Sequence, residues 1–467
     1  MCVEVGIGVL WVILSSIDYA LVVLNLFLPR CPAPKKNLPK VVIVGASFAG
    51  LGVLRELGHH LDEVEVTLVD CKDYFEYVPG ALRCLVRPAH AERLCCDLRR
   101  ATAGATLVVG EVCGVTHDVH KGDGERHRSE VEQRCVTLKD GRSVDYDFLV
   151  LATGSSYAAP IKASSAEATL AARRKSVTAA ASALRHAKTV VVMGAGAVGV
   201  ELAGEILTEY PAGKRVVVVD LAPTILPGFH PRSVRYAERW LAARGAELRL
   251  GAPLKHVSDS EITLADGEKV ACDALYKCTG ARPNADFLGG EGLGEARTGP
   301  RGSLAVDDHL RVAGSDDVFA CGDVCYHEGS KELKLGHTAE VNAHCVALNV
   351  LRLARARTTN VTPPPLATYP DDVVLNSATP KIFNLSLGKY DATLGFNDLV
   401  VHGPLAAVVK WLLEWTKVAA AANRPVGVAF WIFADFAANL LGRTLLPTVP
   451  PPGRKKRASA ISATSSS

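Results

Sequence analysis

One pattern occurs twice in this 467-residue chain and restricts its possible folds more than any other feature. Each copy has a short apolar run, a Gly-rich turn, a helical stretch and a second apolar run that ends in aspartate. In the first copy the apolar runs are residues 41–44 and 64–69, the helical stretch continues to residue 57, and the acid is Asp70. Short apolar runs with many β-branched residues predict buried strands. The turn between them reads Gly45, Ala46, Ser47, Phe48, Ala49 and Gly50.

The second copy has apolar runs at residues 189–193 and 215–219, with a helix expected from residue 200 towards residue 210. Its turn carries three glycines, Gly194, Gly196 and Gly199, and its acid is Asp220. A single Gly-rich turn is weak support, whereas two complete copies in register predict two dinucleotide sites. The turn and the helix N-terminus would hold a pyrophosphate, and the acid would bind ribose hydroxyls. The first copy departs from the pattern because Ser47 replaces the second glycine, but serine is the smallest alternative, so we expect an intact site.

Each copy is followed by a matching closing strand. An acid and an apolar strand lead into Thr153-Gly154 after the first copy and into Thr279-Gly280 after the second. A further strand ends in Gly322-Asp323. The carboxyl ends of parallel strands face the ligand in an open sheet, so we expect these residues beside the cofactors. The sequence therefore predicts an α/β protein with two Rossmann-like domains.

These motifs resemble one protein family. The segments VVIVGASFAG, VLATGSS, MGAGAVGVELAGEI, CTGARPN and FACGD resemble the two-dinucleotide flavoproteins of the pyridine nucleotide-disulfide oxidoreductase superfamily, over about residues 40–350. The segments YFEYVPGALRCLV and LSLGKYDATLGF and the Trp-rich C-terminal region look like the apoptosis-inducing-factor-homologous, ferroptosis-suppressor-like oxidoreductases, relatives of type II NADH dehydrogenases. The resemblance implies FAD in the first unit, NAD(P)H in the second, and electron transfer to a lipid quinone at a membrane surface.

The resemblance also implies roles for single residues. It places Arg83 and the backbone of Val112 on FAD, the carboxylate of Asp70 on the adenosine ribose, and Asp323 on the flavin side. It directs Glu201 towards the nicotinamide–flavin junction, although a helix N-terminus alone would favour an acid there. His337 lies on the stretch expected to cover the isoalloxazine ring, where it is a candidate for proton relay.

The domain boundaries follow from these segments. We expect a hydrophobic anchor and linker at residues 1–38, an FAD-binding domain at 39–160 and 286–365, and an inserted NAD(P)H-binding domain at 161–285. A C-terminal domain with amphipathic helices would cover residues 366–446, and a disordered tail residues 447–467. A homodimer is compatible with this organisation.

Both ends of the chain indicate contact with a membrane. Residues 3–28 are almost wholly apolar and long enough to span a bilayer, although Asp18 also fits a helix in the interface or packed on the core. Basic residues follow this segment, which predicts that the body of the protein faces the cytosol. Residues 403–446 carry Trp411, Leu412 and Trp415 at helical spacing, which suits a membrane interface and equally a dimer or domain contact.

Composition and cysteine spacing argue against other classes. A net charge of +3 gives no basis for bulk nucleic-acid binding. The cysteines lack the spacing of a redox pair, and we expect Cys95-Cys96 to be an inert vicinal pair in a polar helix. No metal site is predicted. Asp220, followed by Leu221 and Ala222 without an arginine, predicts a preference for NADH over NADPH. A redox-sensing signalling protein with little turnover remains the alternative to a quinone reductase.

Overall fold

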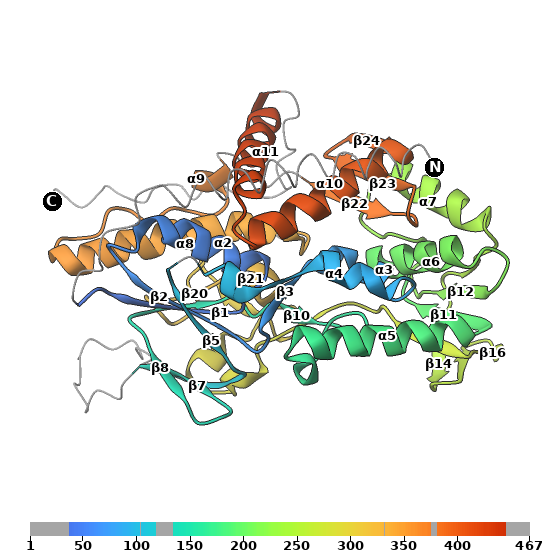
Figure 1. Cartoon of the computed structure of the whole chain (residues 1–467), viewed down its shortest axis with the longest axis horizontal. Coiled ribbons are helices and arrows are strands. Elements are labelled where there is room, and N and C mark those ends of the chain that lie inside the picture. Colours follow the sequence, from blue (N-terminus) through green and yellow to red (C-terminus); the bar gives the residue numbers. More distant parts are fainter. Residues whose placement is uncertain (1–36, 103, 118–133, 331, 375–380, 445–467) are drawn as a thin grey trace, which may run out of the picture.

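The computed structural model describes residues 37–102, 104–117, 134–330, 332–374 and 381–444 (Figure 1). The predicted N-terminal anchor and the predicted C-terminal tail lie outside these residues. Two parallel sheets organise the described part, and each contains one of the Gly-rich units. The predicted α/β fold with two Rossmann-like units is therefore confirmed.

The first unit is a five-stranded parallel sheet with the order β20-β9-β1-β2-β5. Its strands are β1 (Lys40–Val44), β2 (Glu65–Asp70), β5 (Thr106–Val109), β9 (Phe148–Leu151) and β20 (Val318–Ala320). Helices α2 (Phe48–Leu57) and α8 (Gly336–Thr359) cover one face. The antiparallel strands β6 (Val112–Thr116), β7 (Cys135–Leu138) and β8 (Ser143–Asp145) cover the other face.

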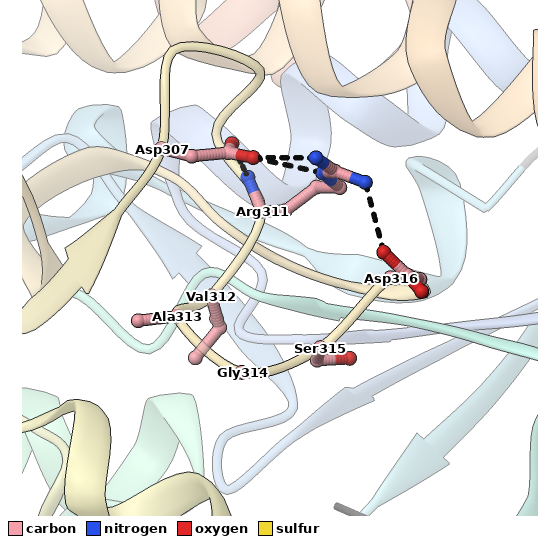
Figure 2. A pocket seen from close by; sticks show the side chains of 7 residues that line it. All are labelled: Asp307, Arg311, Val312, Ala313, Gly314, Ser315 and Asp316. Carbon is pink, nitrogen blue, oxygen red and sulfur yellow. Dashed lines mark hydrogen bonds and ion pairs between the residues drawn. The ribbon is translucent and has the colours of Figure 1, made fainter. Parts of the chain in front are cut away.

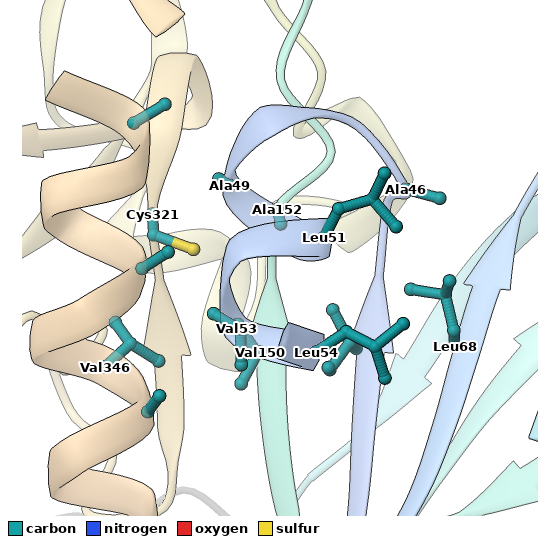
Figure 3. Close-up of a cluster of buried hydrophobic side chains, with 14 of the residues drawn as sticks. Ala46, Ala49, Leu51, Val53, Leu54, Leu68, Val150, Ala152, Cys321 and Val346 are labelled. Atoms are coloured by element: carbon teal, nitrogen blue, oxygen red, sulfur yellow. The ribbon is translucent and has the colours of Figure 1, made fainter. Parts of the chain in front are cut away.

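Side-chain alternation along the strands separates these two layers. Val41 and Ile43 of β1 point into the cluster under α2 and α8, and Val42 and Val44 point into the cluster under β6–β8. Figure 3 shows the first cluster, in which Val346 of α8 faces α2 and the α2 side chains lie over the sheet. Both faces of a parallel sheet are buried, which explains the continuous apolar runs in the sequence.

The second unit repeats this plan with the strand order β13-β12-β11-β17. These strands are β11 (Thr189–Met193), β12 (Arg215–Val219), β13 (Glu247–Arg249) and β17 (Ala274–Lys277). Helices α6 (Ala197–Glu209) and α7 (Pro231–Ala242) pack on one face, and α5 (Leu170–His186) precedes the unit. The antiparallel strands β14 (Leu254–Val257), β15 (Glu261–Leu264) and β16 (Lys269–Ala271) cover the other face.

A third region follows the two units. Strands β22 (Ile382–Ser386), β23 (Ala392–Phe396) and β24 (Leu399–His402) form an antiparallel sheet, followed by α10 (Pro404–Ala421) and α11 (Pro425–Thr444). Helix α10 lies along the body and α11 projects away from it (Figure 1). In the part of the chain described here, no helix combines the length and the apolar character that crossing a bilayer requires.

Short elements connect these regions. The remaining strands and α-helices are β3 (Tyr74–Glu76), β4 (Cys95–Asp97), β10 (Ser155–Ser156), β18 (Arg282–Pro283), β19 (Leu304–Val306), β21 (Cys325–His327), α3 (Ala81–Cys84), α4 (Ala91–Leu94) and α9 (Asp371–Val374). The 3₁₀ helices are η1 (Gly58–His60), η2 (Val78–Gly80), η3 (Pro88–His90), η4 (Leu98–Arg100), η5 (Ser165–Glu167), η6 (Asp286–Leu288), η7 (Gly292–Ala296), η8 (Pro300–Gly302) and η9 (Gly322–Val324). The helix expected around Cys95-Cys96 is wrong, because both residues lie in β4, which pairs with β3. Both thiols are buried there.

Candidate active site

The first and the last glycine of each turn are fixed by close backbone contacts. Gly45 has a φ of +107°, and a Cβ placed on it would lie 2.2 Å from the carbonyl oxygen of Ala152. A Cβ on Gly50 would lie 1.7 Å from the carbonyl oxygen of Gly45. Gly194 and Gly199 meet the same obstacles in the second unit, at 2.5 and 1.8 Å. No side chain fits these four positions without moving the backbone.

The second glycine position behaves differently. A Cβ on Gly196 would meet no atom within 4 Å, so this position faces open space at the N-terminus of α6. A pyrophosphate approaches at this place in a dinucleotide-binding turn, and the protein backbone leaves room for it. Ser47 occupies the equivalent position at the start of α2. The open space at Gly196 shows why this fold accepts serine at the second position, and both turns fit a dinucleotide.

The two acids make equivalent contacts in the two units. Asp70 Oδ2 accepts a hydrogen bond of 2.6 Å from the Ala46 amide, and its Oδ1 accepts one of 2.8 Å from the Lys72 amide. Asp220 accepts from the Ala195 amide at 2.5 Å and from the Ala222 amide at 2.7 Å. Each carboxylate is thereby held beside the turn of its own unit. The backbone of Gly110 also donates to the Asp70 carbonyl, which brings Val112 to the same sheet edge.

The flavin-side acid has a basic neighbour that the motifs did not indicate. Asp323 Oδ2 accepts a hydrogen bond of 2.5 Å from Ser155 Oγ, and Lys162 Nζ lies 3.7 Å from the same oxygen. Lys162 also donates to the carbonyl and hydroxyl oxygens of Ser155 at 2.8 Å. Burial lowers the pKa of Lys162, and the charge of Asp323 opposes this shift. Because Lys162 lies in a loop without a motif, only its distance of eight residues after Gly154 relates it to the site.

The Thr-Gly segments lie at the connection between the units. Thr153 donates from its hydroxyl to the Asn284 carbonyl at 2.6 Å, and the Asn284 side chain donates to the Thr153 carbonyl at 2.9 Å. Strands β10 and β18 pair antiparallel directly beyond these residues. Gly154, Gly280 and Gly322 all have positive φ angles, of 66°, 104° and 77°. The Thr153 hydroxyl therefore joins the two units, while its backbone stays at the carboxyl end of β9. Thr279 lies two residues beyond the end of the equivalent strand β17.

Arg83 lies at the second unit and not at the first turn. Its guanidinium donates to both carboxylate oxygens of Glu205 on α6, with distances of 2.8 to 3.2 Å. One turn further along, Arg87 pairs with Glu209 at 2.5 Å. These ion pairs attach α3 and the segment after it to α6. The predicted contact of Arg83 with FAD stays a prediction.

Glu201 is buried in a contact between the second unit and the C-terminal region. Its Oε1 accepts hydrogen bonds from Lys410 Nζ at 2.9 Å, from the Ser386 amide at 2.8 Å and from the Ser386 hydroxyl at 3.1 Å. Lys410 also donates to the Asn384 carbonyl at 2.8 Å. A helix N-terminus alone does not explain Glu201, because a buried carboxylate needs the cation that α10 supplies.

His337 is the second residue of α8, and it lies in the electrostatic field of Lys417 on α10. Burial lowers its pKa below the usual value near 6.5, Glu340 opposes this shift and Lys417 adds to it. Glu340 forms an ion pair with Lys417 of α10. Lys417 Nζ also lies 3.1 Å from the ring centroid of Trp431 on α11. His337 is therefore near an ion pair without net charge, and burial favours the neutral form of its imidazole.

The buried cysteines are poor nucleophiles. Burial raises the pKa of Cys95, Cys96 and Cys278 to about 12, and it also raises the pKa of Cys321 and Cys325. Thiols that stay protonated do not carry out disulfide exchange. The cysteine positions therefore agree with the prediction of inert thiols.

A surface hollow elsewhere contributes nothing to this site. Residues 307 and 311–316 line it, and Figure 2 shows that Arg311 pairs with Asp307 and Asp316 across it. Its two acids thereby share one guanidinium. None of the residues predicted for cofactor binding lines this hollow.

Comparison with known proteins agrees with this geometry. Residues 39–343 match the model of the pyridine nucleotide-disulphide oxidoreductase family. The chain is 26% identical to ferroptosis suppressor protein 1 of Mus musculus, over 75% of this chain and 87% of the mouse protein. It is 31% identical to an NADH dehydrogenase-like protein of Mycobacterium tuberculosis, over 62% of this chain and 73% of the bacterial protein.

Solved structures show the same fold. The sulfide:quinone oxidoreductase of Aquifex aeolicus superposes with a TM-score of 0.64 at 15% identity, over 87% of this chain and 96% of that chain. The water-forming NADH oxidase of Lactobacillus brevis superposes with a TM-score of 0.55 at 20% identity, over 77% and 75% of the two chains. With its paired Gly-rich units and this match, the chain belongs to the pyridine nucleotide-disulphide oxidoreductase family and is an oxidoreductase that uses FAD and NAD(P)H.

Proposed function

We propose that this protein transfers electrons from NADH through FAD to a lipid quinone at a membrane surface. The observation that carries the proposal is the position of α10. Lys410 of this helix pairs with Glu201 of the second unit, and Lys417 pairs with Glu340 of α8 in the first unit. One helix thus contacts an acid from each unit, at the place where nicotinamide and flavin would meet.

The outward face of α10 supports a lipid surface as the working environment. Lys410, Glu414 and Lys417 are buried, whereas Trp411, Leu412 and Trp415 are only partly buried. Leu405 at the start of α10 is 65% exposed, and Phe433 on α11 is 69% exposed. A helix in contact with water normally has the opposite orientation, with its charges outside. A membrane interface would cover these apolar side chains, and a quinone dissolved in the lipid would arrive from the same side.

The chemistry divides between the cofactors and the chain. Bound FAD would supply the redox chemistry, since a flavin can take two electrons from a nicotinamide and pass them to an acceptor. The chain would bind FAD at the first turn with Asp70 and Asp323, and NADH at the second turn with Asp220. The Glu201–Lys410 pair holds the second unit against α10, and the Lys417–Glu340 pair holds the first unit there. His337 offers an imidazole for proton transfer. The similarity to an NADH dehydrogenase-like protein supports NADH as the donor.

Turnover measurements test this proposal. The purified, FAD-supplemented protein should oxidise NADH rapidly with a soluble quinone and slowly without an acceptor. Gly194→Ala should keep FAD but abolish bleaching of the flavin absorbance by NADH, because its φ of +109° and the nearby Cys278 carbonyl exclude a side chain. Bleaching by NADH that persists for many minutes in the presence of quinone would instead support the redox-sensing alternative.

A further inference from the structure

Quinone reduction by NADH consumes a proton from water. NADH delivers two electrons and one proton as a hydride equivalent, whereas a quinol carries two new O–H bonds. The balance is NADH + H⁺ + quinone → NAD⁺ + quinol, so one proton must reach the junction from solvent. The groups at this junction are buried, and Tyr77, Glu201 and Glu414 are only 5 to 6% exposed. The path by which that proton enters is inferred here, and the inference rests on the proposed function.

Glu414 differs from its two charged neighbours on α10. Lys410 and Lys417 each pair with an acid from one of the units, whereas Glu414 faces a histidine near the surface. Its Oε1 lies 3.0 Å from Nε2 of His90, at ion-pair distance without the alignment of a hydrogen bond. The side chains of His90 and Glu414 are 12% and 8% exposed. His90 ends η3, where Arg87 and Ala89 are exposed, so a single contact leads from the surface to a buried acid.

The groups around Glu414 leave one candidate for exchange with solvent near neutral pH. Arg83 of α3 also interacts electrostatically with Glu414, but it forms an ion pair with Glu205. Its pKa is raised, so it stays protonated. Burial raises the pKa of the Cys84 thiol, so this thiol keeps its proton. The remaining charges close to it on its own helix are Lys410 and Lys417, which both pair with other acids. Among the groups that face Glu414 in the described residues, His90 is the one that carries an imidazole, the side chain that commonly serves as a proton shuttle.

The inner side of Glu414 leads to a phenol. Burial raises the pKa of Tyr77 well above its usual value, and Glu414, Glu201 and Glu340 add to this shift in that order. Tyr77 therefore keeps its O–H. The segment that carries it also borders Glu414: the Gly80 amide donates to the Tyr77 carbonyl at 3.0 Å, and a Cβ on Gly80 would lie 2.8 Å from Glu414 Oε2. Its ring packs edge-on against Phe48, with a centroid distance of 5.8 Å, and Phe48 begins α2 directly after the turn that would hold FAD. The phenol thus lies between α10 and the first turn.

We propose that His90 and Glu414 form the proton inlet of the quinone site, with Tyr77 as the inner donor. The Tyr77 O–H bond breaks as the second quinol O–H bond forms, and the electron pair for the quinone comes from NADH. Glu414 returns a proton to the Tyr77 oxygen, His90 returns one to Glu414, and water reprotonates His90. In Figure 1, α4 lies directly below α10, with α3 beside it, so the segment that carries His90 borders α10.

The test compares two acceptors with the full-length, FAD-loaded protein. A soluble quinone needs the proton, whereas ferricyanide accepts one electron at a time and needs none. His90→Ala should lower quinone turnover about tenfold or more, as for loss of an acid–base group, and leave ferricyanide turnover unchanged. Imidazole added to the buffer should restore quinone turnover of His90→Ala. The control is His344→Ala, which removes the partner of Glu56 from a more exposed His–Glu pair at 3.2 Å and should change neither rate.

The outcomes separate a relay from a structural contact. The quantity measured is the ratio of quinone to ferricyanide turnover per bound flavin, which does not depend on the fraction of protein that folds. His90→Gln should show the same lowered ratio without rescue, because glutamine fills the space for imidazole. The proposed proton inlet is wrong if the ratio is unchanged in both His90 variants. It is also wrong if both acceptors lose turnover equally and imidazole does not restore it. A parent protein that reduces ferricyanide but not quinone refutes the proposed function instead.

Discussion

At the scale of residues, the aspartates of the two units make equivalent hydrogen bonds, whereas the helices that follow the two turns differ in charge. Asp70 and Asp220 both accept from the amide of the second residue of their turn and from the amide two residues after the aspartate. On α2 of the first unit, the position equivalent to Glu201 is Gly52, which carries no charge. The second unit places Glu201 on α6, where Lys410 neutralises it. The unit that is expected to hold the nicotinamide therefore supplies the buried ion pair at the junction.

Replacing Glu201 tests this ion pair. Glu201→Gln leaves Lys410 buried without an anion, and breaking such a pair costs about 3–5 kcal/mol of unfolding free energy. We expect lower stability in urea and NADH:quinone turnover reduced about tenfold or more. The double variant Glu201→Gln/Lys410→Met should regain stability but not turnover. Recovery of turnover in the double variant would show that the pair has only a structural role.

Replacing Asp220 tests the choice of nicotinamide cofactor. A carboxylate beside the ribose repels the 2′-phosphate of NADPH, so Asp220→Asn should raise the kcat/KM ratio of NADPH to NADH by about tenfold. Asp70→Asn is the matched control, because it removes the equivalent charge from the first unit. This control should weaken FAD retention and leave the cofactor ratio unchanged. A wild-type protein that prefers NADPH would contradict the role assigned to Asp220.

At the scale of elements, α10 shows how tertiary contacts can reverse the orientation of an amphipathic helix. Its charged residues lie inside because each meets a partner from another element: Glu201, His90 or Glu340. The small side chains of Ala406, Ala419 and Ala420 fill the rest of the buried face. Its tryptophans are therefore left on the side away from the two units. The same sequence pattern on an isolated helix would favour burial of the tryptophans.

The exposed apolar side chains of α10 and α11 should mediate membrane binding. Leu405→Glu together with Phe433→Glu should weaken cosedimentation with liposomes, because burying each apolar side chain is worth about 1.5–3 kcal/mol. Both residues are exposed, so folding and turnover with a soluble quinone should persist. Val361→Glu is the matched control, since Val361 is 63% exposed and lies two residues beyond the end of α8. Equal binding of the double variant and the control would exclude this surface as the attachment site.

At the scale of the whole molecule, three regions meet along α6. Glu201, Glu205 and Glu209 repeat at every fourth position and pair with Lys410, Arg83 and Arg87. Residues from the C-terminal region and from the first unit thus contact one face of one helix. Strands β10 and β18 provide a second connection between the units. The relative positions of the two cofactor sites are therefore fixed by charges as well as by packing.

Deleting residues 1–38 tests how the whole molecule attaches to membranes. The deletion ends before β1, so we expect the remaining chain to fold, bind FAD and reduce a soluble quinone. Membrane binding should become weaker, because the apolar segment at residues 3–28 is the stronger predicted anchor. The fraction bound to liposomes, compared with that of the full chain, measures the effect. Full binding by the shortened protein would assign the attachment to α10 and α11 alone.

The sequence by itself determined the two nucleotide-binding units. Strands β11 and β12 have the predicted bounds, and α2 ends at the predicted residue. This success has a local cause, because strand, turn and helix follow one another within about 30 residues. Backbone atoms leave no space for a side chain at Gly45 and Gly194, so glycine is required there. The strand at Cys95-Cys96 could not be predicted in this way. Two adjacent cysteines are too few to show a helix or strand period. Their strand conformation comes from antiparallel pairing with β3.

Only the tertiary structure decided which charges meet at the junction. Glu201 and Lys410 are 209 residues apart, and no spacing in the sequence connects them. Lys162, Glu414 and His90 likewise belong to no motif, and a charged side chain without a motif is ordinarily expected on the surface. Burial of such groups requires a partner of opposite charge at hydrogen-bond or ion-pair distance. That partner comes from a distant element, so it is set by how the elements pack and not by the order of residues within any one of them.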